Sequence, residues 1–310
     1  MGKIDFLSIA DFGREELDLI LDLAATLKEA WRAGRSEPRL SGKTLALIFH
    51  KPSLRTRVSF EVGVGQLGGR GLYITDAEIG FGKRESVHDI AQVLSRYVDG
   101  IMIRTFRQSD VAEMAKHASV PVINGLTDAE HPCQILSDLF TLREKGVALD
   151  GMRIAWIGDG NNVAKSWIDA TLAYEIELRL ACPEGYHPDE KAVEQARTSG
   201  KGKVEIFDRP EEAIKGARAI YVDTWTSMGQ EEEAELRRRA FAGYTLDRRL
   251  LGLAGEDALV LHCLPAHRGE EITDEVMDGP QSVVFDQAEN RMHLQKGILV
   301  HCMAAGGGRP

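Results

Sequence analysis

The sequence contains little cysteine, and its apolar runs are short. Its 310 residues include four cysteines that lie far apart and form no Cys-x-x-Cys pair, so a disulfide framework or a structural zinc site is not expected. The best candidates for a membrane span, Thr44–Phe49 and Ala258–Leu264, have only the length of strands. The first residues lack the apolar segment of a signal peptide, and Phe6 stands in place of the Ser or Thr of a myristoylation signal. We therefore expect a cytoplasmic protein.

An excess of positive charge is also absent. The chain has 38 Lys and Arg against 48 Asp and Glu, which gives a formal net charge of −10 at pH 7. This balance argues against broad nucleic-acid binding, which needs a positive field, but it allows a small basic pocket for an anionic metabolite. With 43% hydrophobic and 28% charged residues, the composition is that of an ordinary soluble globular protein, and the length favours two domains.

Short apolar strands alternate with amphipathic helices along nearly the whole chain. The expected strands are Thr44–Phe49, Gly71–Thr75, Ile101–Arg104, Pro121–Asn124, Arg153–Ile157, Glu177–Cys182, Val204–Phe207, Ala219–Val222, Ala258–Leu264 and Ser282–Phe285. The expected helices are Glu15–Arg32, Ser86–Val98, His131–Lys145, Asn162–Tyr174, Asp189–Thr198 and Gln287–Val300. Such alternation predicts an α/β fold in which helices cover parallel sheets. The polar segment Lys145–Gly151 is the expected domain boundary.

The strongest local signal follows the first strand, where residues 51–57 read Lys-Pro-Ser-Leu-Arg-Thr-Arg and open a helix. The free backbone N–H groups and the dipole of a helix N-terminus favour an anion. Arg55 and Arg57 could add bidentate donors for phosphate, and Ser53 and Thr56 could add two hydroxyls. The glycine-lysine pattern of a Walker loop is absent. Considered alone, the segment fits an N-cap serine with surface arginines equally well, and both interpretations stay open at this point.

Other polar residues also follow expected strands. Arg104 ends one strand, His131-Pro-Cys-Gln134 begins a helix after another, and His262-Cys-Leu-Pro265 lies at the end of the strand that begins at Ala258. Ligands of open α/β sheets bind outside the carboxyl ends of the strands. Convergence of these groups on one rim favours a binding site over separate helix caps.

The second half contains weaker signals. Gly158-Asp-Gly160 begins like a dinucleotide fingerprint, but Val163 occupies the third glycine position, so we reject NAD binding. Asp223, which follows the strand Ala219–Val222, could bind a substrate ammonium group or could cap a helix. The charged run Glu231–Arg239 is interpreted as a solvated helix face.

Four segments together resemble the signatures of ornithine carbamoyltransferases. They are Ser53–Arg57, His131–Gln134, Asp223-x-Trp225-x-Ser227-Met228-Gly229 and His262–Pro265, and they occur in that family's order. The resemblance covers essentially the whole chain, from Phe49 to the segment Ala288–Arg291. The first two signatures are shared by carbamoyltransferases at large. The last two point to ornithine as the acceptor, rather than aspartate, N-acetylornithine or putrescine.

The resemblance implies two three-layer α/β/α domains with mainly parallel sheets, joined by two interdomain helices. Residues 1–147 would bind carbamoyl phosphate and residues 148–290 would bind L-ornithine. Residues 291–310 would form a C-terminal helix returning towards the first domain. The resemblance also implies a homotrimer with sites at subunit interfaces, and it implies no metal, no cofactor, no nucleic acid and no membrane as partners.

Position by position, the resemblance assigns contacts to the two substrates. The expected phosphate ligands are Ser53, Leu54, Arg55 and Thr56. The expected carbonyl and amide ligands are Arg104, His131 and Gln134. The residues expected to close over carbamoyl phosphate are Cys263, Leu264 and Arg291. The expected ornithine contacts are Asn162, Asp223, Ser227 and Met228. Arg57 is expected to be a supporting ion-pair residue.

Two positions depart from the family's pattern. The usual Thr of the first signature is Leu54 here, and this position is expected to contribute its backbone N–H, so little should change. Glu78 appears where many members carry Gln, in a loop that is expected to reach a neighbouring subunit's phosphate site. A carboxylate there would repel phosphate unless Lys83 or Arg84 pairs with it, so Glu78 is the open position among the candidate ligands.

The reaction that the resemblance implies is attack of the neutral δ-amine of ornithine on the carbonyl carbon of carbamoyl phosphate, giving citrulline and phosphate in arginine metabolism. Arg55, Arg104 and His131 would stabilise the growing negative charge. Asp223 and Cys263 would orient the amine. A covalent role for Cys263 is the other interpretation, but no base pattern near it supports that role.

Three other functional classes stay open. One is another carbamoyltransferase that uses putrescine or a substituted ornithine, which the Ser227–Gly229 triplet disfavours. Another is a non-catalytic carbamoyl-phosphate or polyamine binding protein, disfavoured because every expected catalytic position holds a competent side chain. The third is a dinucleotide-dependent dehydrogenase, which Val163 disfavours.

Overall fold

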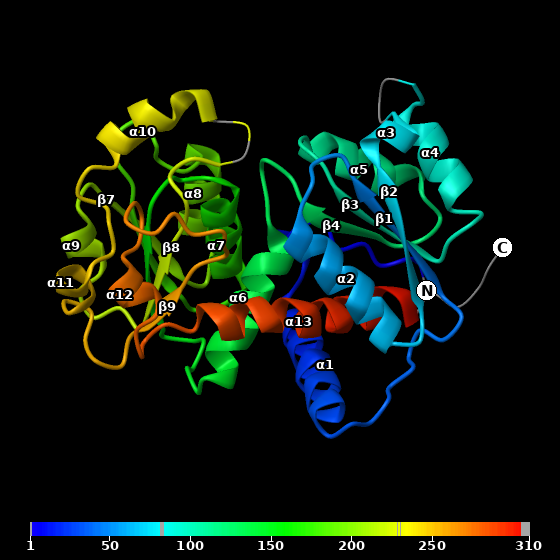
Figure 1. The fold of residues 1–310 in the computed structure, drawn as a ribbon, viewed down its shortest axis with the longest axis horizontal. Coiled ribbons are helices and arrows are strands. Elements are labelled where there is room, and N and C mark those ends of the chain that lie inside the picture. Colours follow the sequence, from blue (N-terminus) through cyan, green and yellow to red (C-terminus); the bar gives the residue numbers. More distant parts are fainter. Residues whose placement is uncertain (1, 81–83, 228, 230, 305–310) are drawn as a thin grey trace. The chain divides into compact units, whose positions relative to one another are not determined.

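Two compact units make up the protein, as seen in a computed structural model that describes residues 2–80, 84–227, 229 and 231–304. The first unit comprises Met1–Ser137 and Asn290–Pro310, and the second comprises Asp138–Glu289. Both divisions fall inside helices, namely α6 (Pro132–Glu144) and α13 (Val284–Ala304) (Figure 1). The chain therefore passes from one unit to the other twice, each time as a helix.

A four-stranded parallel sheet forms the centre of the first unit, in the order β2-β1-β3-β4. Its strands are β1 (Thr44–Phe49), β2 (Arg70–Thr75), β3 (Gly100–Arg104) and β4 (Val122–Leu126). The strands β1, β3 and β4 are buried along their whole length and are mainly apolar, although β3 ends at Arg104 and β4 contains Asn124. The edge strand β2 is half-exposed. Phe49 pairs with both Thr75 and Arg104, so three strands end at one level.

Helices cover both faces of this sheet. They are η1 (Ile9–Asp11), α1 (Arg14–Arg32), α2 (Leu54–Gln66), α3 (Asp76–Ile79), α4 (Val87–Leu94) and α5 (Gln108–His117), together with the second half of α13. Ala46 and Ile48 pack on one face against Ile90 of α4 and Met114 of α5. Successive strand residues point to opposite faces, and α2 packs on β1 and β2 from the other side.

The second unit is built around a five-stranded parallel sheet in the order β7-β6-β5-β8-β9. Its strands are β5 (Arg153–Ile157), β6 (Glu177–Ala181), β7 (Lys203–Phe207), β8 (Ala219–Val222) and β9 (Leu259–Leu261). Its other elements are α7 (Asn162–Ala173), α8 (Glu190–Ser199), α9 (Pro210–Ala213), η2 (Glu231–Glu233), α10 (Ala234–Ala240), α11 (Arg248–Leu251) and α12 (Asp274–Met277).

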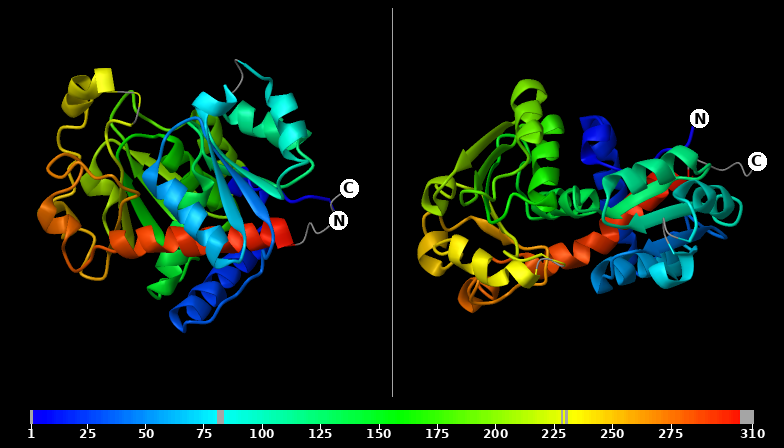
Figure 2. Two further views of the ribbon diagram at one scale, coloured as in Figure 1. Left: turned by 45° about the vertical axis from the view of Figure 1, so that its right-hand side comes forward. Right: turned by 90° about the horizontal axis from the view of Figure 1, so that it is seen from above.

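Aromatic side chains show the three layers of the second unit. Trp156 stacks on Tyr221 with ring centroids 5.1 Å apart, and Trp167 of α7 meets Tyr221 edge-on. On the other face of the sheet, Ile157 and Phe241 belong to the core cluster that includes α11 and α12. Helices therefore lie on both sides of the sheet, as the views in Figure 2 show for α8 and α10. The α/β prediction with two parallel sheets is confirmed.

The structure corrects the end of the predicted strand pattern. Ser282–Phe285 is not a strand: Ser282 makes a single bridge to Val260, and α13 begins at Val284. Val283 and Val284 are buried at the start of the helix, whereas Phe285 is exposed, and an apolar run this short cannot distinguish a helix from a strand. The predicted strand Ala258–Leu264 is reduced to the three residues of β9. No helix in the described ranges is long and apolar enough to cross a membrane.

Candidate active site

The turn after β1 brings the N-terminus of α2 to the carboxyl edge of the first sheet. The His50 N–H donates to the Arg104 carbonyl at 2.9 Å, which ties this turn to the end of β3. Ser53 is the N-cap of α2, and its Oγ accepts from the Thr56 N–H at 3.3 Å. The cap fixes the first turn of α2 beside the ends of β1 and β3, with the positive end of the helix dipole at the same edge.

Thr56 gathers two arginines from distant parts of the chain. Its hydroxyl oxygen accepts from Arg104 Nη1 at 3.3 Å and from Arg291 Nη2 at 3.0 Å, and Ser53 Oγ lies 3.2 Å from it. Thr56 is fully buried, and Arg104 and Arg291 are only 7% and 4% exposed. Two buried guanidinium groups on one neutral hydroxyl repel each other, so the arrangement favours a negatively charged ligand.

His131 directly precedes α6 and belongs to the same cluster. Burial lowers the pKa of the His131 imidazole well below its usual value of 6.5, and the charges of Arg291, Arg104 and Arg55 lower it further. The ring is therefore neutral at pH 7 and can donate one N–H hydrogen bond to a carbonyl oxygen. Gln134, in the first turn of α6, is also completely buried.

Arg57 and Glu78 make other contacts. The Arg57 guanidinium lies over the Tyr73 ring, 3.8 Å from its centroid, and pairs with Glu61 at 3.2 Å. Glu78 Oε2 accepts from the N–H and the hydroxyl of Thr75, at 2.7 and 2.8 Å. These bonds form a capping box for α3 and lower the pKa of Glu78. Glu78 thus has a capping role within its own chain, and Lys83, one of its two expected partners, lies outside the described residues.

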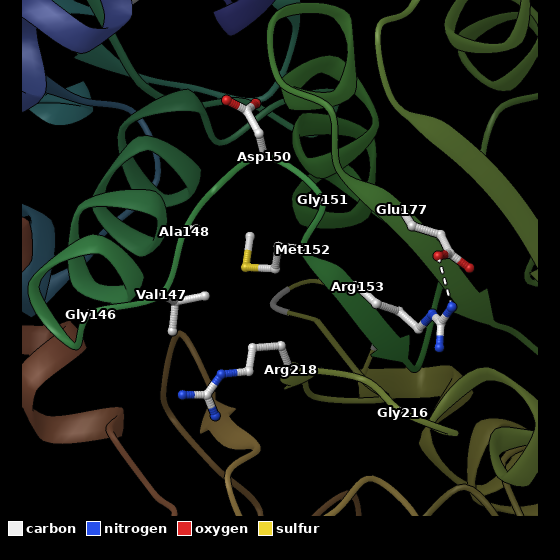
Figure 3. Close-up of a pocket in the computed structure, with 10 residues that line it drawn as sticks. All are labelled: Gly146, Val147, Ala148, Asp150, Gly151, Met152, Arg153, Glu177, Gly216 and Arg218. Carbon is white, nitrogen blue, oxygen red and sulfur yellow. Dashed lines mark hydrogen bonds and ion pairs between the residues drawn. The ribbon is translucent and has the colours of Figure 1, made fainter.

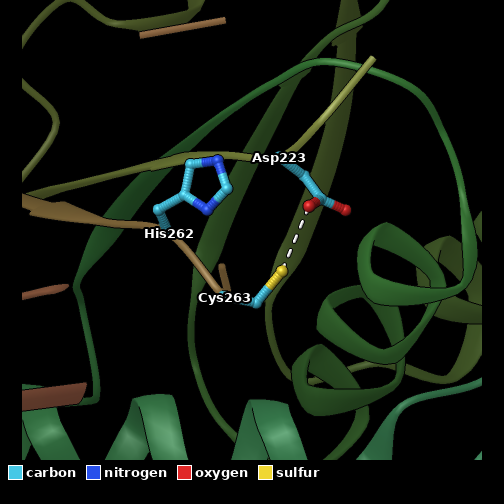
Figure 4. Close-up of side chains that lie close together, drawn as sticks. All are labelled: Asp223, His262 and Cys263. Atoms are coloured by element: carbon cyan, nitrogen blue, oxygen red, sulfur yellow. Dashed lines mark hydrogen bonds between the residues drawn. The ribbon is translucent and has the colours of Figure 1, made fainter. Parts of the chain in front are cut away.

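In the second unit, Asp223 lies at the end of β8 and accepts from three donors. Its Oδ2 accepts from Asn161 Nδ2 at 2.7 Å, and its Oδ1 accepts from the Thr224 N–H at 2.9 Å and from the Cys263 thiol at 3.1 Å (Figure 4). Asp223 is buried, whereas Cys263 is half-buried. Residues 224–227, which follow Asp223, are not helical, so the helix-cap alternative is wrong.

Asn161 was missing from the sequence-based candidates, which contained its neighbour Asn162. Asn161 is the N-cap of α7: its Oδ1 accepts from the N–H groups of Val163 and Ala164, while its Nδ2 holds Asp223. Asn162 is the first residue of that helix. The pair of asparagines between a strand and a helix is an N-cap signal that could have identified Asn161. An added Cβ at Gly160 would collide with the backbone of Pro188, so this glycine serves close chain packing.

The strand end that carries Cys263 is fixed by His262. The His262 Nδ1 accepts from the Leu264 N–H at 2.8 Å, and its Nε2 lies 3.1 Å from Glu271 Oε1, so the ring carries its proton on Nε2. Both His262 and Glu271 are buried. Leu264 has a φ of +60°, which is rare for a non-glycine residue. The hydrogen bond that its N–H donates to His262 Nδ1 holds it in this conformation. The Leu264–Pro265 peptide bond is cis.

Among the described residues, two groups of side chains lie close enough together to hold a metal ion. In the first, one ligand atom each of Asp223, His262 and Cys263 lies within 4.8 Å of the others (Figure 4). Both ring nitrogens of His262 are already hydrogen-bonded, so a metal ion would have to break one of those bonds. The second group, His267, Glu270 and Glu271, shares the Glu271 carboxylate with His262. The donor geometry therefore fits a hydrogen-bonding role for these side chains.

Arg237 of α10 anchors the loop that follows Asp223. Its Nη1 donates to Asp159 Oδ2 at 2.7 Å and to the Trp225 carbonyl at 3.0 Å. Burial raises the pKa of Asp159, and the bond from Arg237 opposes that rise. Arg237 is buried, so the interpretation of this charged run as a wholly solvated helix face is wrong at that position. Ser227, in the anchored loop, is half-buried, and Met228 lies outside the described residues.

A surface pocket lies at the opposite edge of the second sheet. It is lined by the link from α6 to β5 and by the first residues of strands, including Arg153 and Glu177, which pair at 3.0 Å (Figure 3). These are the amino ends of the strands, whereas Asp223 and Cys263 follow carboxyl ends. The pocket is therefore separate from the candidate active site.

The chain matches two domains of one protein family. Residues 4–144 match the carbamoyl-P binding domain of aspartate/ornithine carbamoyltransferases, and residues 150–302 match the Asp/Orn binding domain of the same proteins. The chain belongs to the aspartate/ornithine carbamoyltransferase family. Arg55, Arg104 and His131 lie in the first matched range, and Asp223 and Cys263 lie in the second.

Named relatives match nearly the whole length of this chain. An ornithine carbamoyltransferase of Methanocorpusculum labreanum is 55% identical over 304 residues, which cover 98% of this chain and 99% of the relative. The chloroplastic ornithine carbamoyltransferase of Pisum sativum is 48% identical over 303 residues, 97% of this chain and 81% of that protein. The solved structure of ornithine carbamoyltransferase from Pyrococcus furiosus has a TM-score of 0.94 at 46% identity and covers 99% of both chains.

We expect the imidazole of His131 to stay neutral at every pH above its usual pKa of 6.5, because burial and three guanidinium groups oppose its protonation. The unfolded chain takes up this proton near pH 6.5 and the folded chain only at lower pH, so His131 reduces stability as the pH falls below 6.5. An NMR titration of the ring nitrogens measures the pKa, with the signal assigned by its loss in His131→Asn.

Arg104→Met is the matched variant for this titration. It removes one nearby positive charge and is expected to raise the pKa of His131 towards its usual value. A charged His131 ring at pH 7 in the wild-type protein would contradict the expectation.

Proposed function

We propose that this chain transfers the carbamoyl group of carbamoyl phosphate to the δ-amine of L-ornithine, giving L-citrulline and phosphate, in arginine metabolism. The observation that carries the proposal is the convergence of Arg104 and Arg291 on Thr56, beside the neutral His131. Such a group of donors suits an anion that also carries a carbonyl. The names of the full-length relatives support the same reaction.

The donor substrate would bind in the proposed carbamoyl-phosphate domain, residues 1–147, with the C-terminal helix from residue 291. The N-terminus of α2 would hold the phosphate through the backbone of Leu54 and the side chains of Ser53, Arg55 and Thr56. Arg104, His131 and Gln134 would hold the carbonyl and amide of the carbamoyl group. Arg291 would close over the same ligand, since it already shares the Thr56 hydroxyl with Arg104.

The acceptor would bind in residues 148–290. Asp223 is the principal candidate because it is a buried acidic side chain at a strand end, held by Asn161 and Cys263. It would attract the amino groups of ornithine. Asn162, Ser227 and Met228 complete the proposed acceptor contacts, Leu264 would close over carbamoyl phosphate, and the loop after Asp223 is the proposed moving segment.

The proposed step forms a bond between the δ-nitrogen of ornithine and the carbonyl carbon of carbamoyl phosphate. The tetrahedral oxyanion collapses with cleavage of the carbon–oxygen bond to phosphate, and the leaving phosphate takes up the proton that the amine loses. Arg55, Arg104 and His131 stabilise the oxyanion and the leaving group. The residues supply hydrogen bonds and charge, because phosphate is already a competent leaving group.

A homotrimer with active sites at subunit interfaces is part of the proposal, and the cytoplasm is the proposed compartment. An apolar stripe on α2 supports the assembly: Leu54, Val58 and Val62 are all exposed and four residues apart. Leu72 of the edge strand β2, on which α2 packs, is exposed as well. Apolar patches of this kind mark subunit contacts, and this one begins at the proposed phosphate ligands. Glu78 caps α3 within its own chain, so it is not one of the ligands on which this proposal depends.

A steady-state assay with three acceptors tests the proposed reaction. We expect ornithine to give citrulline with a kcat/KM at least ~100-fold above those of putrescine and N-acetylornithine. N-acetylornithine lacks the free α-amine that Asp223 would hold, and putrescine lacks the α-carboxylate and is disfavoured by the Ser227–Gly229 triplet. Arg104→Met should lower kcat by about 10²-fold, since it removes a donor to the developing charge. Turnover of putrescine alone would favour the alternative carbamoyltransferase, and no citrulline at all would favour a binding protein. A thermal shift with NAD would favour a dehydrogenase.

The variant Cys263→Ala distinguishes a role of Cys263 in orienting the amine from a role as a covalent nucleophile. Because Asp223 keeps its bonds to Asn161 and Thr224, loss of the thiol should lower kcat/KM only about tenfold. Cys182→Ala, a change at a buried cysteine of the same unit, is the control and should leave kcat/KM within about twofold. Mass spectrometry should detect no carbamoyl thioester in the wild-type enzyme, and trapping one would contradict the positioning role.

Val58→Asp tests the apolar stripe as a trimer contact. A charge in the middle of a buried apolar contact should dissociate the assembly, so light scattering should give a mass close to 34.2 kDa instead of three times that value. Leu19→Asp, at an exposed leucine of α1, is the control that should stay trimeric. A trimer that survives Val58→Asp would place the interface elsewhere.

A further inference from the structure

We infer that the hydrogen bonds joining Asp138, Gln287 and His262 couple the proposed donor ligands to the proposed acceptor ligands. This inference rests on the proposed function and makes Asp138 and Gln287 positioning residues that touch neither substrate. Asp138, Gln287 and His262 together are called the polar clamp below.

The polar clamp is short, buried and contained within the second unit. Gln287 Nε2 donates to Asp138 Oδ1 at 2.7 Å, and Gln287 Oε1 accepts from the His262 N–H at 2.9 Å. The Tyr221 hydroxyl lies 3.3 Å from Gln287 Nε2 and is hydrogen-bonded to Asp138. The side chains of Asp138 and Gln287 have no exposed surface. One amide group therefore ties together α6, α13 and the residue after β9.

Helical spacing connects the polar clamp to the proposed donor ligands. Asp138 follows Gln134 by four residues on α6, and Gln287 precedes Arg291 by four residues on α13. Residues four apart lie on the same face of a helix, one turn from each other. A rotation or axial shift of either helix therefore moves a donor ligand and a clamp residue together.

The other end of the polar clamp leads to the proposed acceptor ligands. The N–H that Gln287 holds belongs to the residue directly before Cys263, whose thiol donates to Asp223. The ring of the same histidine accepts from the Leu264 N–H. The position of His262 thus sets the position of Cys263, which is proposed to orient the amine, and of Leu264.

A directional polar contact suits this coupling better than apolar packing. Apolar surfaces can slide slightly with little change in free energy, whereas a buried hydrogen bond that is lost leaves two unsatisfied polar groups. An amide engaged at both ends therefore defines one relative position of two helices and a strand end. An anion that binds Gln134 and Arg291 favours one position of α6 and α13. By thermodynamic linkage, its binding then changes the affinity for the acceptor.

The test measures a coupling factor, defined as the Kd of ornithine alone divided by its Kd in saturating phosphonoacetamide. Phosphonoacetamide carries a methylene group in place of the bridging oxygen of carbamoyl phosphate, so it cannot transfer the carbamoyl group. In Gln287→Glu two carboxylates face each other. We expect isothermal titration of the full chain to show a coupling factor at least ~tenfold below wild type, with the Kd of phosphonoacetamide alone changed by less than about twofold.

The charge-conserving swap Asp138→Asn with Gln287→Glu is the matched control. It restores a donor opposite an acceptor in reversed order and keeps an oxygen for the His262 N–H, so the coupling factor should return to within about threefold of wild type. Gln287→Leu removes the polar contacts without adding charge. It should lower the coupling factor as Gln287→Glu does, and it provides the measurement if Gln287→Glu fails to fold.

Two results would overturn the inference and leave the proposed function intact. One is a wild-type coupling factor in Gln287→Leu. The other is equal weakening of both ligands with an unchanged coupling factor, which a purely structural role would give. A wild-type chain that neither forms citrulline nor binds phosphonoacetamide would overturn the inference and the proposed function together.

Discussion

The hydroxyl of Thr56, shared by Arg104 and Arg291, is the contact on which the first half of the site depends. Two guanidinium groups that converge on one neutral oxygen in a buried place raise each other's electrostatic energy, so rigid surroundings must hold them there. The fold provides that rigidity. Strands β1 and β3 end at one level, Ser53 caps the helix that carries Thr56, and α13 brings Arg291 from the far end of the chain. An anion bound to this cluster would relieve the repulsion and stabilise the folded state.

The second half of the site has the opposite electrostatic character. Its centre is the buried carboxyl of Asp223, which three neutral donors hold in place, and no arginine takes part in those three bonds. A carboxyl group supported by neutral donors keeps its ability to attract an amine. The ion pair between Arg237 and Asp159 serves the loop, since Arg237 also donates to the Trp225 carbonyl. One half thus suits an anionic donor and the other a basic acceptor, although the net charge of −10 indicates neither.

Local patterns in the sequence predict the parts of this structure that depend on neighbouring residues. The buried strands were found because they are continuous apolar runs, and Ser53 was a recognisable N-cap candidate. Contacts between residues that are far apart in the chain leave no such pattern in the sequence. The bond between Thr56 and Arg291 joins residues 235 positions apart, and the resemblance to a family, rather than any periodicity, brought Arg291 into the candidate set. Arg237 was missed because a charged run looks the same whether or not one of its side chains turns inward.

The helix α13 is predicted correctly from Gln287 to Val300, and only its first turn was mistaken for a strand. Its second half places many polar side chains inside the first unit: Asn290 accepts from Lys28 at 2.6 Å, and Lys296 donates to Gln66 at 2.8 Å. Burial lowers the pKa of Lys296 to about 8, so the protein bears a real desolvation penalty there. Polar residues at core positions weaken the amphipathic pattern that identifies a helix. The same hydrogen bonds fix the rotation of α13 about its axis, and that precision is what Arg291 requires in order to reach Thr56. The buried polar residues of α13 therefore carry a desolvation cost and at the same time place the arginine accurately.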